Sequence, residues 1–166
     1  FSNTEYKGIK TESYFHLHQA IKIAPNTTRT FIQNGKVMNK SGFNRYAPHC
    51  RIEVKELKET VQVIAADKFK IKAIVYGEEM IALNAKTQQI AMNQYANNLA
   101  FFDSPRIETM DLIHLILDSE KQKNVYRLTC AGSLSDGSLQ DSPQNIRPGL
   151  KDINDILGKI GQIEQR

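Results

Sequence analysis

The segment Cys50-Arg51-Ile52-Glu53-Val54-Lys55 decides the fold class, because apolar and charged side chains alternate along it. Successive side chains of a β-strand point to opposite faces, so Cys50, Ile52 and Val54 share one face. Residues 126–130 repeat the pattern and place Leu128 and Cys130 on a common face. If both runs are strands of a sheet with a buried face, both thiols point toward the core.

These are the two cysteines of the chain, and they admit two interpretations. In a reducing compartment, Cys50 and Cys130 would be small buried apolar residues. In an oxidising compartment they would join, and a bridge across so long a loop would contribute on the order of 4 kcal/mol in the chain-entropy model. Their positions on inward faces favour the disulfide.

Most of the remaining chain also has the period of β-strands. Residues 14–23 alternate, and 69–76 do so with Lys68, Lys70 and Lys72 facing outward, as in a sheet with one wet face. Asn34-Gly35 favours a two-residue hairpin turn, since both residues tolerate positive φ. Gly77 to Glu79 is interpreted as another turn, and a second hairpin joins 109–117 to 125–130. The stretch 84–106 fits a helix, a flap or an irregular edge equally well.

The C-terminal part of the chain contains the strongest helical period. Residues 131–147 are rich in Gly, Ser, Asp and Pro and predict a surface loop, after which Pro148-Gly149 begins a helix. Its apolar positions are Leu150, Ile153, Ile156, Leu157 and Ile160. We therefore predict a mainly β protein, an antiparallel sandwich or barrel-like sheet with one C-terminal helix packed against it. Residues 1–12 form an irregular N-terminal segment, and 13–166 form a single β-rich domain.

The composition excludes several functional classes. The chain of 166 residues has 22 basic and 18 acidic side chains, a net charge of +4 and a pI near 9.0. Lys and Glu are interleaved along much of it, which is typical of a solvated surface and not of a phosphate-binding stripe. We therefore expect no nucleic-acid partner. The glycines form neither a Gly-x-Gly-x-x-Gly nor a Walker loop, so no cofactor is expected.

Three histidines are the candidates for metal binding or catalysis. His16 and His18 form a His-x-His pair, and His49 precedes Cys50. Two such imidazoles can bind zinc or copper if further ligands converge, but acidic residues do not cluster near them in the sequence. A Gly-x-Ser-x-Gly elbow is also absent from the sequence. We expect no metal and no catalytic residue, with a small hydrolase or metal-dependent enzyme using His16, His18 or His49 as the alternative.

The loop that precedes Cys50 contains two aromatic residues, Phe43 and Tyr46, on either side of Arg45. Exposed aromatic side chains beside arginine can form a recognition surface. The alternative is that Phe43 and Tyr46 fold back over the core next to the cysteine, and this second interpretation is favoured.

Three short motifs resemble a family of uncharacterised exported proteins of proteobacteria. They are Phe31-Ile32-Gln33-Asn34-Gly35, then Tyr46-Ala47-Pro48-His49-Cys50-Arg51-Ile52-Glu53-Val54, then Leu128-Thr129-Cys130. The resemblance implies a periplasmic or lipoprotein-like location and a paired use of Cys50 and Cys130. The chain begins at Phe1, and we expect a signal peptide or lipid anchor, which would be a membrane tether, to precede it. The predicted function is a non-enzymatic exported domain that binds a protein or envelope component or has a structural role.

Overall fold

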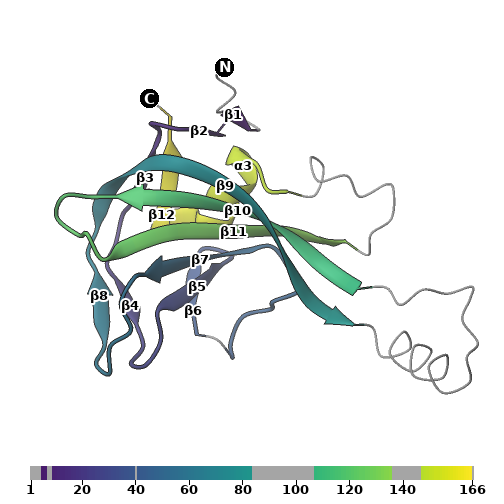
Figure 1. The fold of residues 1–166 in the computed structure, drawn as a ribbon, viewed down its shortest axis with the longest axis horizontal. Helices are drawn as coiled ribbons and strands as arrows, with labels where there is room; N and C mark the ends of the chain where they lie inside the picture. Colours follow the sequence, from purple (N-terminus) through teal and green to yellow (C-terminus); the bar gives the residue numbers. More distant parts are fainter. Residues whose placement is uncertain (1–4, 7–8, 40, 84–106, 136–146, 166) are drawn as a thin grey trace, which may run out of the picture.

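The computed structural model describes residues 5–6, 9–39, 41–83, 107–135 and 147–165. Among these residues, one strongly curled antiparallel sheet of eight strands forms a half-barrel, and one α-helix packs against it (Figure 1). The predicted fold class is therefore confirmed, in its barrel-like form. The order of the strands in this sheet is β12-β3-β9-β10-β11-β7-β5-β6. Two further two-stranded sheets pair β1 with β2 and β4 with β8.

The elements have the following bounds in chain order. They are β1 (Glu5–Tyr6), β2 (Ile9–Lys10), β3 (Tyr14–Leu17), β4 (Ile21–Ile23), β5 (Arg29–Gln33), β6 (Lys36–Met38), β7 (His49–Val54), β8 (Gln62–Ile64), β9 (Asp67–Leu83), β10 (Ile107–Asp118), β11 (Val125–Ser135), α3 (Leu150–Leu157), a 3₁₀ turn η1 (Gly158–Ile160) and β12 (Gly161–Glu164).

The main core lies between one face of the curled sheet, the helix and the β4–β8 ladder. Cys50, Ile52, Leu128 and Cys130 are all fully buried there, as the alternation predicts. The helix α3 contributes Ile153 and Leu157 to this core, among others, and contacts β5 and β7. The opposite face of the same strands therefore points away from the helix.

The hairpin predicted at Asn34-Gly35 is confirmed. Gln33 pairs with Lys36, and the two turn residues have φ angles of 52° and 74°. The turn also docks on the helix, since the Gly35 N–H donates to the Ile156 carbonyl at 2.8 Å.

The predicted helix is too long, because it was expected to reach Ile160. It ends at Leu157, where Gly158 adopts a φ of 55° that ends the α-helical geometry. After the 3₁₀ turn the chain becomes β12, an edge strand that was not predicted from the sequence, and pairs with β3. A Cβ on Gly161 would lie 2.7 Å from the His16 carbonyl oxygen, so only glycine allows the two strands to approach this closely.

The turn predicted from Gly77 to Glu79 is wrong, since β9 runs without interruption through these residues. A Cβ on Gly77 would lie 2.9 Å from His114 Nε2, which shows that this glycine makes room for a neighbouring side chain. A register shift relative to β10 also follows Ile71, so Ile74 packs against the core while Val75 is exposed. The predicted alternation of 69–76 holds for Phe69 and Ile71 and then fails.

The N-terminal third contains more elements than predicted. Residues 14–23 form two strands, β3 and β4, which belong to different sheets. In the segment 1–12, expected to be irregular, β1 pairs with β2 and Ile9 is fully buried.

Two predictions concern segments that lie wholly or partly outside the described residues. The stretch 84–106 lies outside the described residues. Of the loop predicted at 131–147, residues 131–135 extend β11, and 136–146 also lie outside them. Among the described residues, no helix is long and apolar enough to cross a membrane.

Candidate functional site

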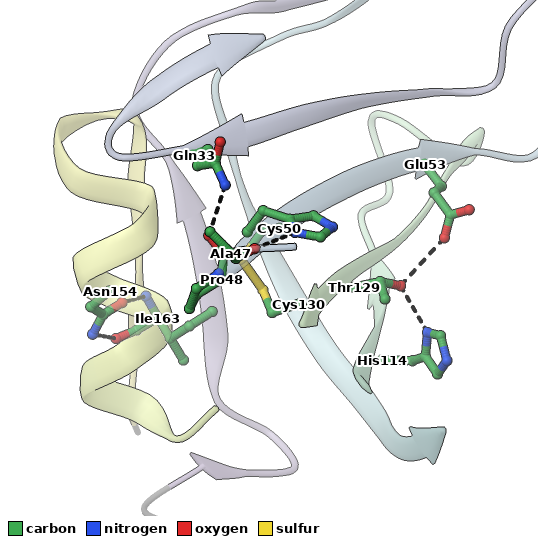
Figure 2. Close-up of a disulfide and its surroundings, with 11 residues drawn as sticks. Gln33, Ala47, Pro48, Cys50, Glu53, His114, Thr129, Cys130, Asn154 and Ile163 are labelled. Atoms are coloured by element: carbon green, nitrogen blue, oxygen red, sulfur yellow. Dashed lines mark hydrogen bonds between the residues drawn. A yellow bond between two sulfur atoms is a disulfide. The ribbon is translucent and has the colours of Figure 1, made fainter. Parts of the chain in front are cut away.

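The disulfide joins the two cysteines predicted to pair. Cys50 and Cys130 lie directly opposite each other on β7 and β11, with an S–S distance of 2.09 Å. Both are fully buried on the face of the sheet that packs against α3. Figure 2 shows the bridge between the helix on one side and Glu53, Thr129 and His114 on the other. It therefore fixes the two strands whose opposite face forms the site described below.

A buried polar network covers the middle of that opposite face. Glu53 accepts a bond from Arg127 Nε at 2.5 Å and one from the Thr129 hydroxyl at 3.3 Å. Since Thr129 has a single hydroxyl proton, the 2.8 Å contact of its oxygen with His114 Nδ1 requires the ring to donate (Figure 2). Burial lowers the pKa of His114, and the nearby Arg127 and Arg51 lower it further. The ring is therefore neutral at pH 7, with its proton on Nδ1.

A pocket of about 200 Å³ lies beside this network. Its walls come from β5, from the 41–48 loop and from β7, and also from the far end of β9, which is more distant in the sequence. We call it the arginine pocket, and its lining residues are Arg29, Phe31, Phe43, Arg45, His49, Arg51, Glu79, Met80 and Ile81. In Figure 1 the ends of β9 and β10 pass beyond β11 and bend toward the loop that precedes β7. This bend brings the β9 residues to the pocket.

The 41–48 loop is held in place by Gln33, a buried side chain of β5. Its amide donates to the carbonyls of Asn44 at 2.9 Å and Pro48 at 3.2 Å, and it accepts from the Asn44 N–H at 2.9 Å. At the other end, the Arg45 guanidinium donates to the Ile81 carbonyl. The loop is thereby fastened to both β5 and β9, which sets the position of Phe43 and Arg45.

Three aromatic rings form one wall of the pocket. Phe43 stacks on Phe31 with centroids 4.0 Å apart, and the His49 ring lies edge-on to Phe43 at 4.8 Å. Burial lowers the pKa of His49, whose Nδ1–H donates to the Ala47 carbonyl at 2.8 Å. Phe43 thus folds back on the sheet, but on the face opposite the disulfide and in a pocket wall. Neither interpretation of this loop foresaw that combination.

The charged side chains of the pocket and network do not balance. Arg51 Nη1 lies 3.2 Å from Glu79 Oε2, and its Nε lies 3.9 Å from the Glu53 carboxylate. Arg127 also pairs with Glu53, so these two arginines offset the two glutamates. Arg29 and Arg45 have no acidic partner among the described residues. Two positive charges therefore remain in excess at the pocket.

The three candidate histidines, His16, His18 and His49, do not lie together in the structure. His16 and His18 lie together beside β12, with ring centroids 4.6 Å apart, and His16 Nδ1 contacts Glu164 Oε1 at 3.1 Å. The His16 side chain is 41% exposed and borders none of the described pockets. His49 belongs to β7, which three strands separate from β3 in the sheet. Among the described residues, no group of three or more His, Cys, Asp or Glu side chains is placed to hold a metal ion.

The outward lysines of β9 are largely neutralised by neighbours. Lys68 Nζ lies 3.5 Å from Glu164, and Lys70 Nζ lies 2.7 Å from Glu12. An alternating row of lysines in the sequence is therefore not a continuous basic face in the fold.

Most of the pocket residues could not be recognised from the sequence. Arg29, Glu79 and Met80 carry no motif, and Glu79 was assigned to a turn that does not exist. Arg51 is a charged residue on the strand face opposite Cys50, yet its side chain is only 9% exposed. An alternating Arg and Glu on a strand shows that they share a face, but it does not show whether another segment covers that face.

The described residues form an antiparallel half-barrel with a disulfide between two neighbouring strands, one helix, and an arginine-lined pocket on the face away from that helix. Comparison of the chain with protein-family models, curated proteins and solved structures finds no match.

Proposed function

We propose that this protein is a non-enzymatic, exported domain of the cell envelope that binds a protein or another envelope component through the arginine pocket. The observation that carries the proposal is the excess of positive charge beside an aromatic wall. Arg and aromatic side chains are the residues that dominate the energy of binding surfaces. A structural role alone would not require uncompensated arginines at the mouth of a pocket.

The disulfide supports a periplasmic or similar oxidising location. Such bonds form and persist in secreted and periplasmic proteins and are rare where thiols are kept reduced. Here the bridge is directly cross-strand and fully buried, so it belongs to the folded core.

The chemistry of the pocket favours binding over catalysis. A nucleophilic mechanism needs Ser, Thr or Cys beside a base, and the residues that line the pocket include none of these three. The one histidine in its wall is packed against Phe43 and donates to a backbone carbonyl, so its Nδ1 does not accept a proton from a substrate.

Photo-cross-linking in the native compartment tests the proposal. A photoreactive phenylalanine analogue replaces Met80, a pocket residue that is 61% exposed, and in a matched control it replaces Val63, which is 58% exposed on β8. We expect a discrete adduct from position 80 that is absent from position 63 and disappears when Arg29→Gln and Arg45→Gln are added. No adduct at position 80, or one that survives removal of both arginines, would refute binding through this pocket.

A further inference from the structure

The donors of the arginine pocket point to the kind of chemical group that it receives. A guanidinium carries five N–H donors in a planar fork that matches the oxygens of a carboxylate or phosphate. Arg51 is nine-tenths buried in the pocket wall, and its Nε has no hydrogen-bond partner among the described residues. The Arg29 side chain has no hydrogen bond or ion pair with the described residues, while Arg45 uses one donor on a backbone carbonyl. The pocket therefore has more donors than the folded chain satisfies.

The apolar part of the lining limits which anion fits. Phe31 and Phe43 form a stacked wall, and Ile81 and Met80 face the same space. A bare inorganic anion would contact the guanidinium groups but leave this apolar surface in water. An anion that also carries a hydrocarbon or aromatic group would cover both parts.

The size of the pocket sets the extent of the ligand. Its volume of about 200 Å³ is below the roughly 300–1,000 Å³ of pockets that enclose drug-sized molecules. It is suited to one acidic group with one side chain of amino-acid size.

Building on the proposed function, we propose that the arginine pocket binds a carboxylate that bears an apolar or aromatic group. Arg29 and Arg45 bind the carboxylate at the mouth of the pocket, and Arg51 adds positive charge from its buried position in the wall. The stacked rings of Phe31 and Phe43 cover the apolar group. This chemistry is shared by small free organic acids and by the carboxyl-terminal residue of a peptide.

The test is a titration of the oxidised full chain, followed by calorimetry and by backbone amide chemical shifts. The probes are N-acetylphenylalanine and its amide, a hexapeptide ending in phenylalanine with a free or an amidated carboxyl group, and inorganic phosphate. We expect the probes with a free carboxylate to shift the backbone amide signals of β5, β7 and the 41–48 loop. The amidated probes should bind at least about tenfold more weakly, as for loss of one charge-assisted hydrogen bond. Stronger binding of the hexapeptide than of N-acetylphenylalanine identifies a chain terminus as the source, and equal binding identifies a free acid.

Variants assign the binding to particular side chains. Arg29→Gln and Arg45→Gln should each weaken binding of the free carboxylate about three- to tenfold, since both remove a charged donor while leaving the buried Arg51 in place. Lys22→Gln, which removes an exposed positive charge from β4, is the matched control and should leave it unchanged. The proposal is overturned if acid and amide bind equally, if phosphate alone binds as tightly, or if all three variants behave alike.

The two proposals fail differently. If the carboxylate probes do not bind while the adduct from position 80 still depends on Arg29 and Arg45, the ligand class is wrong and the binding function stands. If the adduct is also absent, binding through the pocket itself is wrong.

Discussion

Removing the disulfide should destabilise the domain by an amount that follows from its topology. Cys50 and Cys130 are separated by 80 positions, and closing a loop of that length lowers the entropy of the unfolded chain by an equivalent of about 4.5 kcal/mol at 25 °C. Both residues are fully buried on paired strands, so Cys50→Ala with Cys130→Ala keeps the apolar character of the core. The loss of the bridge should therefore dominate the change in the free energy of unfolding.

Urea unfolding measures this loss. With a slope of about 2 kcal/mol per molar urea, the unfolding midpoint of the double variant should lie about 2 M below that of the oxidised protein. Cys50→Ala alone should show nearly the same loss, because one remaining thiol cannot form the bridge, and the reduced wild-type protein should behave likewise. Equal midpoints for the oxidised protein and the double variant would refute the view that this bond stabilises the fold by restricting the unfolded chain.

Three further perturbations test other parts of the fold. Gly158→Ala should lower the free energy of unfolding, measured with urea, by about 2–3 kcal/mol, because a φ of 55° disfavours a side chain and the new Cβ would lie 2.9 Å from the Gly35 Cα. A loss below about 0.5 kcal/mol would contradict this. Glu53→Ala should lower the free energy of unfolding by about 2–3 kcal/mol, because it leaves the part-buried Arg127 without its carboxylate and the buried Arg51 with Glu79 alone, whereas exposed Glu56→Ala should cost almost nothing; equal losses would disprove the network. Burial lowers the pKa of His49 and His114, so the unfolded chain binds more protons than the folded one below about pH 6.5. The free energy of unfolding should therefore fall as the pH drops from 7 to 5, and imidazole titrations by NMR that show ordinary or raised pKa values would contradict this.

The parts of the fold that depend on local pattern could be predicted from the sequence. The alternation of 50–54 and 126–130 placed both cysteines on inward faces, because side-chain direction in a strand depends only on the period of two. Asn34-Gly35 predicted its turn for an equally local reason, since few other pairs adopt two positive φ angles.

The parts that failed depend on contacts between distant segments. Gly77 looked like a turn residue, but its role is to leave space for His114 on the neighbouring strand. The final strand β12 could not be recognised because Gly161 is required by its approach to β3, which lies at the other end of the chain.

The candidate site was hidden for the same reason. Arg51 and Glu53 have the pattern of a solvated strand face, and only the curl of the sheet and the loop held by Gln33 turn that face into a pocket wall. The pocket also includes Glu79, Met80 and Ile81 from the more distant β9, and sequence spacing does not indicate that this strand meets the 41–48 loop.

The oxidation state of Cys50 and Cys130 in the cell tests most directly whether this is an exported domain with a disulfide bond. The measurement is the intact mass of protein taken from its native compartment with free thiols blocked at lysis, before and after reduction. We predict that no thiol is blocked initially and that reduction adds the mass of two hydrogen atoms. Two blocked thiols in freshly isolated material would contradict both the oxidising location and the function built on it.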